Sequence, residues 1–312
     1  MNQIKPLDLL IIGASAAGVT SAVYAARRKL NFAIISTDIG GEVATSGKIE
    51  NYTGFPKTDG FELTEQFKKQ LEYNEIIVEA GVVVAKVTQQ NGSFLTSGNT
   101  LKGKKDWSSK AVILASGAHP KKLGLPGEEE FRGKGVTYCT TCDGPLFKGK
   151  KVVTIGGGNG VLESALMLAE IGEHTTIINK NSFFKGEQIL IDSVTSNPKI
   201  EIIYNAMTSE IIGADSVTGV KYRDKTTNQE KTIETQGVFI HIGLIPNSSM
   251  VDFVDKNKPG EIIVDMAGKT NVPGLFAAGD VTNTPFKQIA IAAGQGVAAA
   301  LSAVSYLNNL KK

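Results

Sequence analysis

LDLLIIGASAAG, residues 7–18 of the chain, decides its fold. The stretch starts with a near-continuous apolar run, Leu7–Ile12, of the kind that forms a buried strand. A glycine turn follows and leads into a helical pattern at Val19–Arg28. A strand, a glycine turn and a helix in this order form a dinucleotide-binding unit, in which N–H groups at the helix N-terminus hold a pyrophosphate. Ser15 replaces the central glycine of GxGxxG, and a small residue there still permits a phosphate to approach.

A second copy of this unit lies in the middle of the chain. The strand-like run Val152–Ile155 is followed by GGGNGV at residues 156–161 and then by the helical stretch Leu162–Ile171. One such motif alone is also compatible with a plain strand-to-helix turn, but a duplication within one chain is far more specific. The two copies together predict two ligands of the dinucleotide type.

The segments around the first unit predict a loop and a small sheet. Residues 40–56 form a long polar, glycine-rich connection, and such loops without secondary structure of their own tend to be functional. Residues 75–110 have the pattern of a β-meander packed against the first unit. Asp38, which follows the second predicted strand, is interpreted either as a contact to an adenosine ribose or as an exposed loop acid.

The last third of the chain predicts a second polar contact for a ligand. A short buried strand at residues 275–278 closes on Gly279-Asp280 and precedes a helix of small residues, Gln288–Leu307. An acid on a tight turn beside a helix N-terminus suits a hydrogen bond to a polyol chain. The alternative is a simple Gly-Asp turn pair.

The only two cysteines stand in the stretch Tyr138-Cys139-Thr140-Thr141-Cys142-Asp143. A structural zinc site needs four ligands, and the three histidines of the chain are scattered singly, so no metal site is predicted. A lasting structural disulfide is rare in the cytosol, where a chain without a signal peptide is expected. The pattern therefore indicates a redox-active pair, with Asp143 placed to carry the proton that thiol exchange requires.

Composition excludes several classes of protein. The chain has 312 residues with 41% apolar and 21% charged content, which is ordinary for a soluble protein of two domains. A net charge of +2 without basic clusters gives nucleic-acid binding no support. The apolar runs are too short or too interrupted to predict a membrane span, and we expect a cytoplasmic protein.

Taken together, these motifs resemble the low-molecular-weight thioredoxin reductases over essentially the whole chain. The stretches that carry the resemblance are GASAAG at 13–18, GGEV at 40–43, ENYTGFP at 50–56, ASGA at 115–118, CTTCD at 139–143, GGGN at 156–159 and GLFAAGDV at 274–281.

The resemblance implies an α/β protein with two Rossmann-like, three-layer ββα nucleotide-binding domains, the second inserted into the first. An FAD domain would comprise residues 1–118 and 247–312, and a pyridine-nucleotide domain carrying the cysteines would comprise residues 119–246. It further implies a homodimer with one FAD per protomer. The small domain would swing on hinges at residues 118–122 and 244–247.

The resemblance also assigns roles to residues. Cys142 would face the flavin and accept its electrons, Cys139 would attack the partner disulfide, and Asp143 would act as acid and base. The implied FAD-binding residues are Gly13, Ser15, Ala16, Gly18, Gly40, Gly41, Glu42, Asn51, Ala115, Gly117, Gly279, Asp280, Lys287, Gln288 and Ile289.

The electron donor stays open at this point. The implied pyridine-nucleotide residues are Gly156, Gly158, Asn159, Lys180 and Lys185. Members that use NADPH have an arginine-rich stretch for the 2′-phosphate where this chain has Asn179-Lys180-Asn181-Ser182, and lysine lacks the bidentate fork of arginine. Val161 stands where the motif has a small residue and is expected to push the helix away from its strand. NADPH, NADH and ferredoxin therefore all remain candidates.

The predicted function is an FAD-dependent disulfide reductase that acts on thioredoxin or a thioredoxin-like protein. The alternatives are an NADH-dependent reductase of a peroxiredoxin system and a non-catalytic flavin and thiol redox sensor. A ferredoxin-NADP reductase on the same scaffold is disfavoured by the cysteine pair.

Overall fold

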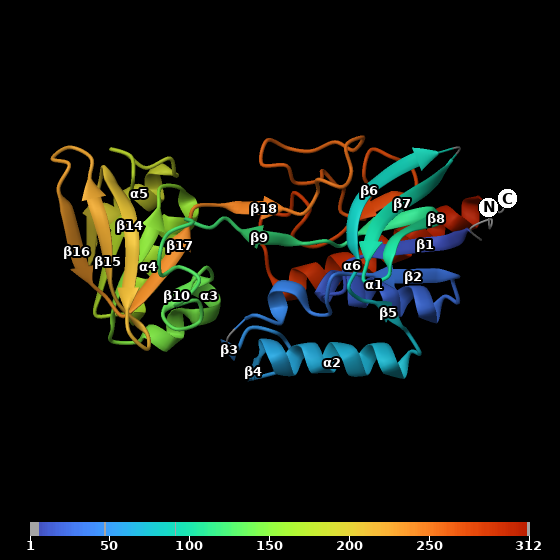
Figure 1. Ribbon diagram of the computed structural model, residues 1–312, viewed down its shortest axis with the longest axis horizontal. Helices are drawn as coiled ribbons and strands as arrows, with labels where there is room; N and C mark the ends of the chain where they lie inside the picture. The colour runs from blue at the N-terminus through green and yellow to red at the C-terminus, as the bar shows by residue number, and fades with distance from the viewer. Residues whose placement is uncertain (1–5, 47, 91, 311–312) are drawn as a thin grey trace. The chain divides into compact units, whose positions relative to one another are not determined.

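The protein folds into two compact units, each with its own parallel sheet (Figure 1). The structure, a computed structural model, describes residues 6–46, 48–90 and 92–310. One unit comprises the chain up to His119 together with the part from Ile245 onward, and the other comprises Pro120–Leu244. The predicted α/β class with two Rossmann-like parts is confirmed.

The first unit is built on the strand, turn and helix with which the sequence analysis began. Its parallel strands run in the order β5-β2-β1-β8-β19. Strand β19 pairs with the end of β8, on the edge of β8 that does not pair with β1. These strands are β1 (Leu7–Ile12), β2 (Phe32–Ile35), β5 (Val78–Glu79), β8 (Gly103–Leu114) and β19 (Leu275–Ala277). The helices are α1 (Ala16–Arg27), α2 (Gly60–Tyr73) and α6 (Ile289–Asn309).

Strand β8 belongs to two sheet regions at once. Its first half pairs antiparallel with β7 (Ser93–Thr100), which in turn pairs with β6 (Val83–Gln90), and its second half pairs parallel with β1. The sequence predicts a meander here, but its last predicted strand is much shorter than β8. The first residues of β8 are charged and exposed, so they lack the apolar pattern of a strand. Backbone pairing with β7 extends the strand regardless of that charge.

The two ends of the chain meet in this unit, where blue α1 and red α6 lie side by side (Figure 1). A Cβ on Gly296 would lie 2.3 Å from the carbonyl oxygen of Ala17, so only glycine permits this approach of the two helices. Ser21 Oγ donates a hydrogen bond of 3.0 Å to the Gly296 carbonyl. Small residues in α6 are therefore explained by close helix packing.

By length and composition alone, α6 is also apolar enough to cross a membrane. Its window has a mean hydropathy of 1.5, and 28% of that window is buried. A single helix of this kind is weak evidence for a membrane span, because a helix of a soluble fold passes the same test.

The second unit has a five-stranded parallel sheet in the order β10-β17-β11-β12-β13 and a separate antiparallel sheet β14-β15-β16. The parallel strands are β10 (Val136–Thr137), β11 (Lys151–Gly156), β12 (His174–Ile178), β13 (Ile200–Ile203) and β17 (Gly237–His241). The antiparallel strands are β14 (Ala206–Gly213), β15 (Val217–Asp224) and β16 (Glu230–Glu234). The helices are α3 (Thr140–Asp143), η2 (Gly144–Phe147), α4 (Asn159–Ile171) and α5 (Gln188–Thr195).

Among the elements that are absent from the sequence-based expectations, α5 and β16 are the two longest. Helix α5 is short and rich in β-branched residues, and its Val194 is buried against Val161 and Leu162 of α4. Strand β16 is almost wholly polar, with Ile233 alone packing on the core. Both elements exist because a neighbour covers their one apolar side, which a local pattern does not reveal.

The long connection at residues 40–56 contains regular structure, so that part of the prediction is wrong. It holds the 3-10 turn η1 (Gly41–Val43) and the first strand of the short pair β3 (Lys48–Ile49) and β4 (Thr58–Asp59). The two crossings between the units, β9 (Ala118–Pro120) and β18 (Leu244–Pro246), pair with each other. The predicted hinges thus coincide with a two-stranded ribbon, and hinge motion stays a prediction.

Candidate functional site

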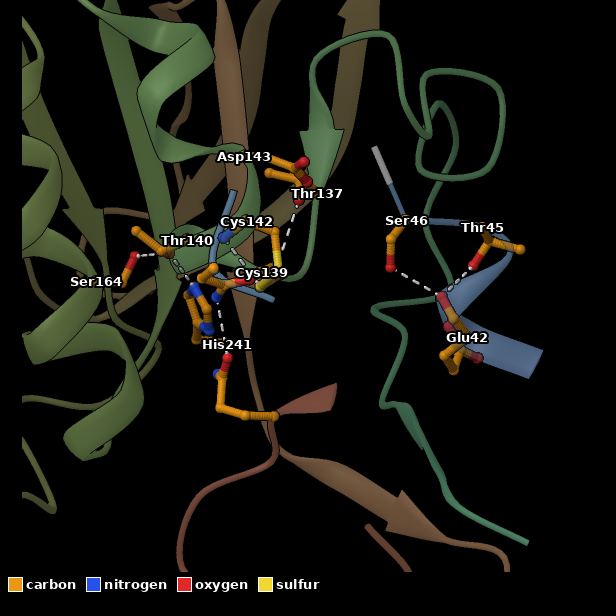
Figure 2. The surroundings of a disulfide bond; sticks show 12 residues. Glu42, Thr45, Ser46, Thr137, Cys139, Thr140, Cys142, Asp143, Ser164 and His241 are labelled. Atoms are coloured by element: carbon orange, nitrogen blue, oxygen red, sulfur yellow. Dashed lines mark hydrogen bonds between the residues drawn. A yellow bond between two sulfur atoms is a disulfide. The ribbon is translucent and has the colours of Figure 1, made fainter. Parts of the chain in front are cut away.

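The two cysteines form a disulfide at the start of a short helix (Figure 2). Cys139 is the N-cap of α3 and Cys142 lies in its single turn, with the two Cα atoms 5.3 Å apart. The Cys142 N–H donates a hydrogen bond of 3.2 Å to Cys139 Sγ. After the ring opens, this N–H is in place to donate a hydrogen bond to a thiolate at Cys139.

Asp143 is held beside the disulfide by Thr137. The Thr137 hydroxyl donates to Asp143 Oδ2, and its oxygen accepts a 3.2 Å hydrogen bond from the Cys139 N–H (Figure 2). Burial raises the pKa of Asp143 above its usual value, and the Thr137 hydrogen bond opposes that rise. A carboxyl group that takes up a proton more readily than usual suits a proton carrier next to a thiol. The sequence analysis missed Thr137; a hydroxyl residue two positions before the motif was its only signal.

A chain of hydrogen-bonding side chains lies behind α3. Thr140 Oγ1 is 2.6 Å from Ser164 Oγ in α4 and 2.8 Å from His241 Nε2 at the end of β17. Ser164 Oγ is also 3.2 Å from Thr154 Oγ1 in β11. Burial lowers the pKa of His241 to about 4, so the ring is neutral at pH 7.

This neutral histidine predicts a specific loss of stability in acid. Because its pKa is about 4 in the folded protein and near 6.5 when unfolded, the unfolded chain binds more protons between those values. The contribution of the neutral ring to the free energy of unfolding is complete above pH 6.5 and is lost as the pH falls towards 4. This loss amounts to at most about 3 kcal/mol. In thermal unfolding at pH 7 and pH 5, His241→Gln should therefore show a smaller fall in midpoint than the parent. An equal fall in both proteins would contradict a buried neutral His241.

The glycine turn of the first unit lies where three parallel strands end. The carboxyl ends of β1, β8 and β19 lead into Gly13, Ala115 and Gly279, and ligands of such folds bind at this edge. A Cβ on Gly13 would lie 2.1 Å from the Ala115 carbonyl oxygen, and one on Gly18 would lie 1.8 Å from the Gly13 carbonyl oxygen. The helix α1 thus starts as close to its strand as the backbone allows, and Ser15, its N-cap, makes no side-chain capping hydrogen bond.

Ser15 instead joins the glycine turn to the GGEV segment. Its hydroxyl donates a 2.6 Å hydrogen bond to the Gly40 carbonyl, and the Gly40 N–H donates to the Ala14 carbonyl at 2.9 Å. This explains the serine at the centre of the motif. The Asp38 carboxylate accepts a 2.8 Å hydrogen bond from the Gly41 N–H, which favours its interpretation as a loop acid.

The Asp280 carboxylate is a candidate hydrogen-bond acceptor for a ligand. Within the described part of the chain, no hydrogen bond or ion pair reaches its side chain. Burial raises its pKa, Lys287 opposes the rise, and Glu42 adds to it. A half-buried acceptor beside a glycine turn fits the hydroxyl groups of a polyol. The backbone of the turn is fixed by Gln295, whose Oε1 accepts a 2.8 Å hydrogen bond from the Gly279 N–H and which the sequence analysis missed.

The remaining residues implied for FAD occupy the same unit. Asn51 Nδ2 donates a 3.2 Å hydrogen bond to Oε1 of Gln288, the N-cap of α6. The Lys287 side chain lies against the loop between β19 and α6, where its Nζ donates to the Thr282 carbonyl at 2.6 Å. It also forms an ion pair with Glu261 at 2.8 Å. Ala16 and Ile289 are the first residues of α1 and α6, and Gly117 follows β8 with a φ of 68°.

The second glycine motif is looser than the first. Val161 is fully buried where α1 has Gly18, so α4 cannot approach its strand as closely as α1 does. A Cβ on Gly156 would lie 2.2 Å from the His241 carbonyl oxygen, whereas one on Gly158, the N-cap of α4, would meet nothing within 4 Å. Asn159 is committed to the loop before α5, bonding to Glu187 through both ends of its amide, at 2.8 and 3.0 Å.

The side chain at the end of β12, Asn179, is already hydrogen-bonded within its own loop. Asn179 is fully buried, its Nδ2 donates to the Phe183 carbonyl at 3.0 Å, and its Oδ1 accepts from the Asn181 N–H at 3.0 Å. Lys180 and Lys185 are exposed on this loop. Lys225, absent from the predicted set, joins them, because its Nζ donates to the Lys180 carbonyl at 3.2 Å.

Comparison with known families and curated proteins gives consistent matches. The pyridine nucleotide-disulphide oxidoreductase family profile matches residues 7–296. The chain is 41% identical over 97% of its length to the "NADH dehydrogenase" of Bacillus subtilis, and 40% identical over its full length to a component of the alkyl hydroperoxide reductase of Escherichia coli. It spans 59% and 60% of those two proteins, or about three fifths of their length.

Solved structures are similar over nearly their whole length. The thioredoxin reductase of Streptococcus pyogenes has 33% identity and a TM-score of 0.88, covering 97% of this chain and 98% of that one. The ferredoxin-flavin thioredoxin reductase of Clostridium acetobutylicum has 32% identity and a TM-score of 0.55, covering 99% of both chains.

Proposed function

Because the chain belongs to the pyridine nucleotide-disulphide oxidoreductase family, we propose that it reduces the disulfide of a thioredoxin or thioredoxin-like protein through Cys139 and Cys142. The resemblance to thioredoxin reductases drawn from the motifs is confirmed by the solved structures. The observation that carries the proposal is the Cys139–Cys142 disulfide with Asp143 next to it. Such a ring opens and closes by thiol–disulfide exchange through a mixed disulfide.

The family makes this chain a flavoprotein, and its cofactor is FAD. The residues of the first unit fit the group: the α1 N-terminus has no capping side chain for a pyrophosphate to displace, and Asp280 accepts no hydrogen bond from any residue that the structure describes. FAD, when bound, supplies two-electron chemistry. Gly13, Ser15 and Gly18 would hold its pyrophosphate, and Asp280 its ribitol.

The cysteine pair would pass two electrons to the partner by thiol–disulfide exchange. Opening the Cys139–Cys142 bond takes two electrons and two protons, and Asp143 is placed to hold one of these protons. Cys139 then loses its proton and its thiolate attacks one sulfur of the partner disulfide; a mixed disulfide forms, and the other partner sulfur leaves as a thiolate that takes up this proton. Cys142 loses its proton in turn and attacks Cys139, which restores the ring and releases the second partner sulfur, to which the second proton passes, so that the partner leaves as a dithiol.

For the electron donor, we propose a nicotinamide nucleotide with little discrimination between NADH and NADPH. The open N-terminus of α4 supports pyrophosphate binding, as does the family to which the chain belongs. The loop after β12 supports weak discrimination, since Asn179 is closed on its own loop and no arginine stands among Asn179–Lys185. Lysines offer point charges instead of a fork for a 2′-phosphate.

Anaerobic mixing of the flavoprotein with each donor tests this. We expect flavin bleaching by both nucleotides, with rates at equal concentration within about tenfold, which corresponds to about 1.4 kcal/mol. Bleaching by reduced ferredoxin, but by neither nucleotide at millimolar concentration, would overturn the proposal. That result would place the chain beside the ferredoxin-flavin enzyme among its structural neighbours.

A second candidate partner follows from the relatives. Over its full length, the chain matches the alkyl hydroperoxide reductase component, which supports a reductase that serves a peroxidase system. Turnover is measured with a thioredoxin and with a disulfide-containing protein that passes electrons to a peroxidase. Faster turnover with one of them identifies the partner.

The assembly and the location of the protein are also proposals. We propose a homodimer, supported by the apolar helix α6, of whose 18-residue window only 28% is buried within one chain. We propose the cytoplasm, since a dithiol reductase needs a reducing compartment to be useful.

A further inference from the structure

The side chains behind the disulfide belong to four different elements. Thr140 comes from α3, Ser164 from α4 and His241 from β17 (Figure 2), and Thr154 comes from β11. Ser164 is linked to Thr140 at 2.6 Å and to Thr154 at 3.2 Å, and Thr140 is linked to His241 at 2.8 Å. Thr140, Ser164 and Thr154 are buried, with exposed fractions of 5%, 3% and 0%. Buried hydroxyl groups are costly unless they are hydrogen-bonded, so the arrangement of their protons is constrained.

One direction of the hydrogen bonds satisfies every hydroxyl. Thr154 donates to Ser164, Ser164 donates to Thr140, and Thr140 donates to His241 Nε2. The reverse direction leaves the Thr154 hydroxyl without an acceptor among the described residues. The chain of donors therefore ends on an unprotonated Nε2, which requires a neutral ring with its proton on Nδ1.

We propose that His241 is a positioning residue for the Cys139/Cys142 pair, acting through the hydroxyl of Thr140. Thr140 directly follows Cys139 and is the first residue of α3, so its side chain anchors the turn that carries Cys142. With this turn fixed, the Cys142 N–H points at Cys139 Sγ and the two sulfurs stay within bonding reach. The proposal rests on the proposed function in one respect: it takes the pair to be redox-active.

His241 does not act on the sulfurs as an acid or a base. Its Nε2 is occupied by Thr140, and burial keeps its pKa near 4. Asp143, by contrast, faces Thr137 on the other side of the motif. The two titratable groups therefore have separate tasks, proton transfer at Asp143 and geometry at His241.

The consequence is measurable as a redox potential. Anchoring α3 raises the effective concentration of one thiol at the other and so favours the closed ring. Without the anchor, we expect the equilibrium constant for ring closure to fall about tenfold, which makes the potential about 30 mV less negative.

Four variants of the flavoprotein test this in pairs. Thr140→Val and His241→Phe each remove the hydrogen bond between residues 140 and 241 at similar side-chain volume. Thr140→Ser keeps the hydroxyl at position 140, and His241→Gln keeps an acceptor at position 241. Each is equilibrated in a series of oxidised and reduced dithiothreitol mixtures, and the fraction of dithiol is counted by alkylation and mass. Thermal midpoint and flavin content at pH 7 identify any variant that has failed to fold; in that case Thr140→Ala replaces Thr140→Val and His241→Leu replaces His241→Phe, since each also removes the hydrogen bond.

We expect the equilibrium constant for ring closure to fall about tenfold in Thr140→Val and His241→Phe. In Thr140→Ser and His241→Gln it should change by less than about twofold. Constants within twofold of the parent in all four variants would overturn the role of His241 while leaving the proposed function intact. A parent whose cysteines do not exchange between disulfide and dithiol would overturn both. The expected shifts in a protein that fails to reduce thioredoxin would support the positioning role and remove only the proposed partner.

Discussion

Cys139→Ser and Cys142→Ser should each abolish disulfide reduction, by about 10³-fold or more, while the flavin stays bound. In the proposed mechanism each thiol has a step that the other cannot perform: Cys139 would make the mixed disulfide with the partner, and Cys142 would resolve it. A serine hydroxyl is far less nucleophilic than a thiolate at neutral pH and cannot close a disulfide ring. Turnover with a thioredoxin and an electron donor is the measurement.

The flavin provides the control for these two variants. All residues implied for FAD lie in the unit formed by the chain up to His119 and from Ile245 onward, whereas the cysteines lie in the other unit. Flavin absorbance per chain and bleaching by the donor should therefore be unchanged. Sustained reduction of the partner by either serine variant would show that electrons do not pass through the pair.

Gly18→Ala should cause the largest structural loss, with flavin content falling below about a tenth of the parent. The added Cβ would lie 1.8 Å from the Gly13 carbonyl oxygen and 2.7 Å from its carbon, and both are backbone atoms that no rotamer change can move. Overpacking of this kind costs about 3 kcal/mol, and it would displace the helix N-terminus that we propose holds the pyrophosphate. Flavin absorbance and circular dichroism measure the two effects.

The second glycine motif offers a matched control. Gly160 lies in the first turn of α4, and a Cβ there would meet nothing within 4 Å. Gly160→Ala should retain full flavin content and unfold at or above the parent temperature, because alanine favours a helix over glycine by about 1 kcal/mol. Equal flavin content in Gly18→Ala and Gly160→Ala would mean that close packing of α1 on its strand is not what holds the cofactor.

Elements with local sequence signals could be predicted before the structure was known. An apolar run ending in a glycine turn identifies β1 and α1, and the same pattern identifies β11 and α4, since strand, turn and helix are adjacent in the chain. The cysteine pair and the acid beside it also lie within one short stretch. The family and the α/β class followed from these motifs because the family's chemistry depends on backbone turns that only certain residues can make.

Only the tertiary structure decided which distant side chains meet. Asn51 and Gln288 are 237 positions apart and share a hydrogen bond, and Thr140 reaches His241 across 101 positions. Asn159 bonds to Glu187, 28 positions away, and Asn179 bonds within its own loop, so neither amide is left free for a ligand. The physical reason is the same in each case: a hydrogen bond is fixed by the position of its partner, and that position comes from sheet order and helix packing rather than from the neighbouring sequence.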